Sequence, residues 1–144
     1  MPDAKFCVRA QSENPTKTIV KARGFSFIVD EPDTLGGTND GLSPVEYLLG
    51  AFAGCLNVVG HLIAKEMSFE LKSLKIEMRG DINIDKLLGV SDAERCGFKG
   101  IDVVLKPECN ADEATLEKWV QIVKSRCPIS DNLGNITPIE VEIK

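Results

Sequence analysis

The residues of this 144-residue sequence that could most readily do chemistry are five cysteines, which are accompanied by a single histidine. The cysteines are Cys7, Cys55, Cys96, Cys109 and Cys127. Their odd number, their wide spacing and the lack of any Cys-x-x-Cys pair argue against a disulfide framework and against a structural zinc site. We therefore interpret them as free thiols, of which any that ionises near neutral pH is a candidate nucleophile.

Cys55 lies in the middle of a long apolar segment. Burial among apolar side chains disfavours a thiolate, and a mid-helix position gains little from the helix dipole. Cys55 would therefore need a nearby cation to ionise near neutral pH. The candidates for that cation are Arg9, Arg23 and Arg126.

Cys127 stands at a predicted helix end, between Arg126 and Pro128. The neighbouring arginine and a short helical turn that could start at Pro128 both favour a thiolate, or at least thiol exchange, at this position. Because a free cysteine is most often buried and inert, the sequence context alone leaves the roles of both Cys55 and Cys127 open.

His61 is not expected to form a catalytic pair with Cys55. On a helix the two residues are about 240° apart, so their side chains point in different directions. His61 follows one turn after Asn57, and we interpret it as an interior or interface histidine with its hydrogen bonds satisfied.

The elements that must position these thiols begin with three short segments rich in strand-forming residues. These segments cover residues 5–10, 18–23 and 25–29, and they predict a meander of three strands. Residues 30–41 then collect turn-forming residues and predict a loop. The Gly36-Gly37 pair in this loop lacks the following Lys-Ser/Thr of a phosphate-binding loop, which argues against nucleotide binding.

A helix is predicted from Ser43 to about Lys65 or Glu66. Ser43 and Glu46 form a capping box, with Pro44 at the first helical position. The segment is apolar on every side, and its length would also suit a membrane span. A helix buried inside the fold is the interpretation we favour, because strand patterns typical of a globular domain flank it on both sides.

The second half of the sequence predicts two strands, a helix and a closing strand. Apolar residues alternate at 74–78 and at 101–105, and residues 81–100 form an excursion between these strands. Asn110 and Glu113 suggest the start of an amphipathic helix that runs to about Arg126, and apolar residues alternate again at 139–143. The predicted fold class is therefore α+β, in the order β-β-β-α-β-β-α-β.

Composition and charge limit the possible partners. The chain has 17 Lys+Arg against 22 Asp+Glu, a net charge of -5, so nucleic acid and anionic membranes are not expected to be partners. The first residues do not form a basic and then apolar leader, so we expect a cytoplasmic protein. We expect residues 1–144 to form a single domain, and we expect dimerisation, since one chain can hardly cover an all-apolar helix.

Several motifs taken together resemble the OsmC/Ohr family. They are Asp30-Glu31-Pro32, Leu35-Gly36-Gly37, the stretch from Ser43 through Ala53-Gly54-Cys55, and the late Cys127-Pro128. The resemblance covers roughly residues 18–144, and the predicted order of elements agrees with it.

This resemblance implies an OsmC-like fold, which is an intertwined, domain-swapped homodimer with active sites at the subunit interface. It also implies a thiol peroxidase that reduces organic hydroperoxides without a metal, haem or flavin cofactor. In this mechanism Cys55 attacks the peroxide and becomes a sulfenic acid, Cys127 resolves it as a disulfide, and a dithiol reduces the disulfide. Arg23, or alternatively Arg9, would stabilise the Cys55 thiolate.

The sequence departs from the peroxidases of this family at one position. They carry an acidic residue directly after the proline, and this chain has Val45 there. Glu46 lies about 180° from Cys55 around the helix and is explained by the capping box. The sequence therefore leaves a second function open, a non-enzymatic module that binds a small apolar ligand or partner beside Cys55.

Overall fold

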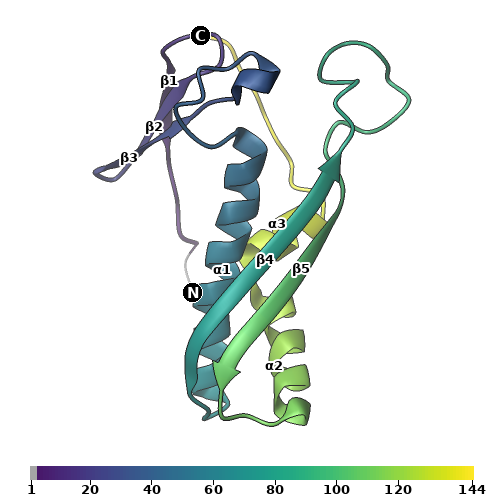
Figure 1. Ribbon diagram of the computed structural model, residues 1–144. Coiled ribbons are helices and arrows are strands. Elements are labelled where there is room, and N and C mark those ends of the chain that lie inside the picture. The colour runs from purple at the N-terminus through teal and green to yellow at the C-terminus, as the bar shows by residue number, and fades with distance from the viewer. Residues whose placement is uncertain (1–2) are drawn as a thin grey trace. The chain divides into compact units, whose positions relative to one another are not determined.

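The N-terminal unit, which ends at Gly50, is built on a three-stranded antiparallel sheet in the order β1-β2-β3 (Figure 1). The structure is a computed structural model that describes residues 3–144. The strands are β1 (Arg9–Ser12), β2 (Thr18–Ala22) and β3 (Phe25–Val29). The predicted meander is thus confirmed, although β1 begins four residues later than its apolar residues suggested.

A buried carboxylate organises the loop after β3. Asp30 is fully buried, and its oxygens accept hydrogen bonds from the hydroxyls of Thr16 and Thr38. They also accept from the backbone N–H groups of Glu31, Thr38 and Asp40. Burial alone would raise the pKa of the Asp30 carboxyl, but these hydrogen bonds outweigh it and hold the pKa well below its usual range.

Asp30→Asn is expected to lower the melting temperature at neutral pH by on the order of 5 °C. Whichever way the amide is turned, its N–H₂ would face a backbone N–H group, which can only donate. Since the folded pKa lies below the unfolded value of about 3.9, the advantage of the wild type is present above about pH 4 and fades as the pH falls further. Thermal melts of the two proteins across this range measure the effect.

The control for this experiment is Asp33→Asn, because Asp33 is exposed on the short 3-10 helix η1 (Asp33–Leu35). We expect its melting curves to match those of the wild type. Equal losses in Asp30→Asn and Asp33→Asn, or a difference from the wild type that does not change with pH, would contradict the role given to Asp30.

Helix α1 (Pro44–Glu66) begins where the capping box predicted. The Ser43 backbone N–H donates to Glu46 Oε1 at 3.0 Å, and the Glu46 N–H donates to Ser43 Oγ at 3.3 Å. The capping box therefore occupies the Glu46 carboxylate, and it holds the pKa of Glu46 below its usual value, chiefly through the hydrogen bond from the Ser43 backbone N–H.

Only one face of α1 is buried in the single chain. The buried residues are Phe52, Leu56, Val59, Gly60, Ile63 and Ala64. On the other side of the helix, Val58 is 66% exposed and Leu62 is 46% exposed. By length and composition α1 could also cross a membrane, and 28% of its most apolar stretch is buried within the fold. We expected this helix to be buried on all sides, but the single chain buries one side of it.

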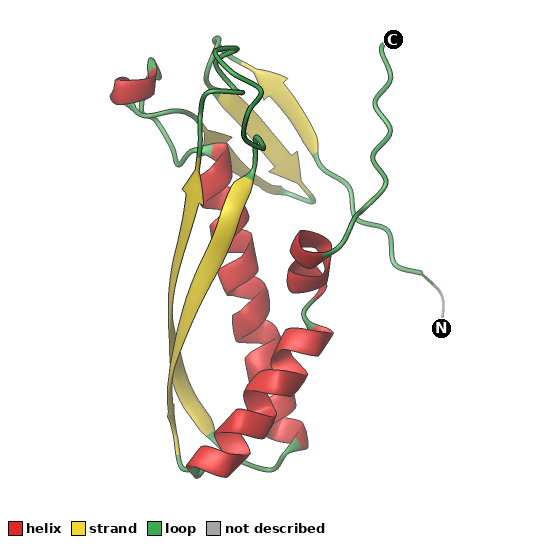
Figure 2. Cartoon of the chain, turned by 90° about the vertical axis from the view of Figure 1, so that its right-hand side faces the viewer, coloured by secondary structure: helices red, strands yellow, loops and turns green. Residues whose placement is uncertain are grey.

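The C-terminal unit, residues 51–144, combines the rest of α1 with a long hairpin and two further helices. The hairpin pairs β4 (Leu71–Ile82) with β5 (Phe98–Cys109) in antiparallel register. The helices are α2 (Glu113–Arg126) and α3 (Pro128–Gly134). Figures 1 and 2 show that α1 and α2 lie on the same face of the hairpin. The predicted alternation is confirmed, since the inward apolar residues of both strands pack against the core.

Trp119 of α2 joins this core to α1. Its ring is 1% exposed, and its Nε1–H donates to the Gly60 carbonyl oxygen at 2.8 Å. A Cβ atom at Gly60 would lie 3.1 Å from the Trp119 ring, so the small residue permits this close approach. At Gly50 and Gly54, in contrast, an added Cβ would meet no atom within 4 Å.

The prediction for the start of α2 was wrong by two residues. Asp112 is the cap, and its side chain accepts a hydrogen bond from the Thr115 N–H at 2.8 Å. Asn110, the predicted cap, instead accepts a hydrogen bond from the Glu70 N–H at 3.3 Å. This bond links the start of β4 to the end of β5, at the open end of the hairpin. Both residue types favour helix starts, so the sequence pattern could not separate them.

The predicted closing strand is absent from the single chain. Residues 135–144 form neither helix nor strand, and the four apolar side chains of this tail are almost fully exposed. They are Ile136, Ile139, Val141 and Ile143, which are 97%, 83%, 88% and 97% exposed. An alternating pattern describes a strand that needs a neighbour, and no described strand of the same chain pairs with this one.

Candidate thiol site

Two cysteines that are far apart in the sequence lie in direct contact. The Sγ atoms of Cys55 and Cys127 are 3.0 Å apart, and both are free thiols. Cys55 comes from the middle of α1, and Cys127 lies between α2 and α3. Both belong to the C-terminal unit. At this separation a sulfenic acid on one sulfur could condense with the other to form a disulfide.

Pro128 determines the position of Cys127. A residue before proline is disfavoured in helical conformation, and Cys127 is extended, with φ −81° and ψ 114°. Helix α2 ends there and α3 begins at Pro128, so Cys127 is the N-cap of α3 and its Sγ accepts from the Ser130 N–H at 3.4 Å. Ser130 was not predicted, because sulfur is not among the usual capping atoms.

The two thiols differ in their exposure to solvent. Cys127 is 1% exposed, whereas Cys55 is half-buried. Burial, followed by the hydrogen bond to Cys55, raises the pKa of the Cys127 thiol above its ordinary value. In the reduced protein at neutral pH, Cys127 is therefore a protonated thiol.

Arg126, one of the three candidate cations, is engaged by a carboxylate. Its two terminal nitrogens donate to both carboxylate oxygens of Glu66, at 2.7 and 3.1 Å. The hydrogen bond from Arg126 lowers the pKa of Glu66, so the two side chains form an ion pair that ties the end of α1 to the end of α2.

The other two arginines belong to the N-terminal unit. Arg9 is the first residue of β1, and Arg23 lies in the turn between β2 and β3, where its φ is 60°. The Arg23 guanidinium carbon is 5.2 Å from the centre of the Phe25 ring. The sequence suggested that Arg23 is the last residue of a strand, but β2 ends at Ala22 and Arg23 lies in the turn. Its pairing with Cys55 stays a prediction.

Among the described residues, neither the remaining thiols nor His61 form a hydrogen bond with Cys55 or Cys127. Cys7 and Cys96 are exposed, and Cys109 is half-buried at the end of β5. His61 is exposed and its Nδ1 lies 2.9 Å from the Asn57 carbonyl oxygen, a local bond within α1.

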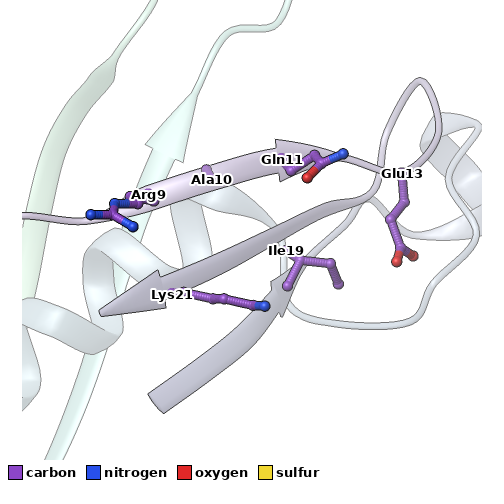
Figure 3. A pocket seen from close by; sticks show the side chains of 6 residues that line it. All are labelled: Arg9, Ala10, Gln11, Glu13, Ile19 and Lys21. Carbon is purple, nitrogen blue, oxygen red and sulfur yellow. The ribbon is translucent and has the colours of Figure 1, made fainter. Parts of the chain in front are cut away.

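A separate hollow of about 550 Å³ lies on β1 and β2 of the N-terminal unit (Figure 3). It is lined by Arg9, Ala10, Gln11, Glu13, Ile19 and Lys21. Arg9 and Lys21 are cross-strand neighbours in the sheet register. Most of the lining side chains are exposed, and they include the positive Arg9 and Lys21 and the negative Glu13. This mixture is usual for the solvent face of an antiparallel sheet. The lining includes no thiol, so we place the candidate chemistry at the cysteine pair.

The chain was compared with protein families and with individual known proteins. The family model for OsmC-like proteins matches residues 37–142. The chain is also 28% identical over 146 residues to the uncharacterized protein YmaD of Bacillus subtilis (strain 168), a match that covers 99% of this chain and 95% of YmaD.

Solved structures show the same fold at lower identity. An OsmC-like protein from Mycoplasma pneumoniae matches with a TM-score of 0.82 at 18% identity, covering 94% of this chain and 91% of that one. An organic hydroperoxide resistance protein OsmC from Legionella pneumophila matches with a TM-score of 0.66 at 17% identity, covering 92% of this chain and 91% of that one. At these identities the likeness establishes the α+β fold and not the activity.

Proposed function

Because the chain belongs to the OsmC-like protein family, we propose that it is a thiol-dependent peroxidase that reduces organic hydroperoxides. The observation that carries this proposal is the 3.0 Å contact between the sulfur atoms of Cys55 and Cys127. The structural likeness to proteins named for organic hydroperoxide resistance adds support. We further propose that residues 1–144 act as one OsmC-like domain in the cytoplasm.

In the proposed reaction the Cys55 thiolate attacks one peroxide oxygen and the O–O bond breaks. The alcohol leaves after taking up a proton, and Cys55 becomes a sulfenic acid, two electrons poorer. Cys127 then attacks the Cys55 sulfur, a disulfide forms and water leaves. A dithiol reductant returns both cysteines to thiols, so no metal, haem or flavin is required by this cycle.

The experiment that tests the proposal is a titration of free thiols. One equivalent of cumene hydroperoxide should remove two free thiols per chain, because the first oxidation and the resolution follow one another. Hydrogen peroxide should react more slowly, since its lack of an organic group removes apolar contacts with the site. Unchanged thiols after both treatments would contradict peroxidase activity.

We propose that Arg23 stabilises the Cys55 thiolate, with Arg9 as the alternative. Arg23→Ala should move the pH midpoint of Cys55 alkylation upward by about one unit, because a nearby cation favours the charged form. It should reduce the rate of reaction with hydroperoxide more than it reduces the melting temperature. A shift in Arg9→Ala alone would transfer this role to Arg9.

The dimer implied by the resemblance is also a proposal. It is supported by the exposed side of α1 and by the apolar tail at residues 136–143, both of which leave apolar surface uncovered in one chain. A second copy that packs on α1 and pairs with the tail would bury both surfaces.

A second candidate function is binding of a small apolar ligand or partner beside Cys55 without catalysis. It is favoured by Val45, which replaces the acidic residue expected after Pro44, and by the engagement of Glu46 in the capping box. Saturable binding of an apolar ligand by a protein whose thiols do not react with hydroperoxide would support this alternative.

A further inference from the structure

The contact between Cys55 and Cys127 raises the question of which sulfur holds a proton in the reduced protein. Two thiolates 3.0 Å apart would repel strongly, so near neutral pH at most one of them is ionised. The negative charge is better solvated on the half-buried Cys55 than on Cys127, which is 1% exposed. A single negative charge on the pair would therefore reside on Cys55, with the proton on Cys127.

The surroundings of Cys127 orient that proton. The Cys127 sulfur accepts a hydrogen bond from the Ser130 N–H at 3.4 Å, which occupies one side of the atom. Its own S–H is placed to donate to the sulfur of Cys55, 3.0 Å away. A thiol is a weak donor to a neutral acceptor, but a hydrogen bond to an ionised group is about twice as strong as a neutral one.

We propose that Cys127, before any peroxide binds, donates its S–H to the Cys55 thiolate and so acts as a positioning residue that activates Cys55. This role rests on the proposed function and precedes the resolving step. The S–H donor would stabilise the Cys55 thiolate in a chain that has Val45 where the family's peroxidases carry an acidic residue. Arg126, a candidate cation, is already paired with Glu66.

The same proton has a defined place in the later step. When Cys55 has become a sulfenic acid, Cys127 attacks its sulfur and the S–O bond breaks. The proton released by Cys127 joins the departing hydroxide to give water, so Cys–SOH and Cys–SH become a disulfide and H₂O. No further base is needed to remove the proton from the buried thiol.

The test uses a full-length background in which Cys7, Cys96 and Cys109 are replaced by serine or alanine. In this background we compare Cys127, Cys127→Ser and Cys127→Ala by the pH dependence of iodoacetamide alkylation of the Cys55 peptide. We expect Cys127→Ala to raise the alkylation midpoint by about one unit, which lowers the thiolate fraction at neutral pH about tenfold. Cys127→Ser keeps a hydroxyl donor and should stay close to the parent midpoint.

Controls separate hydrogen bonding from packing. The other titratable groups are the same in the three Cys127 proteins, including His61, Asp131 and the Glu66–Arg126 pair on the elements that carry the two thiols. Restoring Cys109 in the background should not move the midpoint, because it lies at the end of β5. Equal midpoints in the serine and alanine variants, whether raised or unchanged, would overturn the proposal.

The readout also separates this inference from the peroxidase itself. Alkylation needs no peroxide, so it can be measured whether or not the protein is a peroxidase. If the alkylation midpoints of Cys127→Ser and Cys127→Ala differ but the wild type does not reduce hydroperoxides, the hydrogen bond is supported and the proposed function is overturned. Peroxidase activity with equal midpoints would overturn the hydrogen bond and keep the function.

Discussion

Cys55→Ser is expected to abolish hydroperoxide reduction, with a rate at least about three orders of magnitude below that of the wild type. A serine hydroxyl is not ionised near neutral pH and is not oxidised to a sulfenic acid, so the first step is lost. Consumption of cumene hydroperoxide in the presence of a dithiol measures the effect. Melting curves provide the control, and we expect a small change because serine is close to cysteine in size.

Cys127→Ser should give a different result from Cys55→Ser. The first oxidation survives, since the attacking sulfur remains, but turnover stops or slows because no thiol resolves the sulfenic acid. Labelling with dimedone should then detect a sulfenic acid on Cys55. Loss of both the first oxidation and turnover in a folded Cys127→Ser protein would contradict the assignment of Cys127 as the resolving residue.

Peptide mapping after mild oxidation tests the same pair in the wild type. A single disulfide between Cys55 and Cys127 is expected, with Cys7, Cys96 and Cys109 still reduced. Among the described residues, the sulfurs of Cys55 and Cys127 are the pair in contact. A different dominant disulfide, or none, would count against the proposed cycle.

Local signals in the sequence predicted the local structure well. The Ser43, Pro44 and Glu46 pattern predicted the start of α1, since a capping box satisfies backbone N–H groups through neighbouring residues. Pro128 likewise predicted the end of α2, because its constraint acts on the residue before it. Both signals depend on interactions between residues that are close in the chain.

The sequence could not predict contacts between distant residues by the same reasoning. Cys55 and Cys127 are 72 positions apart, and their spacing carries no period that would bring them together. The family resemblance suggested the pair, and the packing of α1 and α2 on the hairpin brings their sulfurs into contact. The choice between Arg9 and Arg23 has no local signal either, since both stand among short strands with similar patterns.

The closing strand shows a further limit of pattern reading. The alternation of Ile139, Val141 and Ile143 reports which side of a strand would be covered, but not which chain supplies the cover. The same holds for α1, whose apolar residues are buried on one side and exposed at Val58 and Leu62. Neither feature is explained within a single chain, and the proposed second copy would account for both.

Leu62→Asp is therefore expected to disrupt association and folding together. Leu62 is 46% exposed in the single chain, so a monomer would tolerate aspartate there at little cost. In the proposed dimer the carboxylate would be buried without a partner, at a cost of more than about 3 kcal/mol, which corresponds to a loss of association of at least about 100-fold. Gln121→Asp, on an exposed site of α2, is the matched control and should remain dimeric.

Gly54→Ala gives a second readout whose sign depends on the dimer. In a free helix the change should stabilise the protein by up to about 1 kcal/mol, because alanine favours helix over glycine and meets no atom within 4 Å here. If another helix packs closely on α1, the added methyl group should destabilise the protein instead. Sedimentation at about micromolar concentration distinguishes a monomer from a dimer. It is measured together with stability, since folding and association are coupled in such a dimer. A folded, stable wild-type monomer, with Gly54→Ala more stable and Leu62→Asp unchanged, would contradict the dimer.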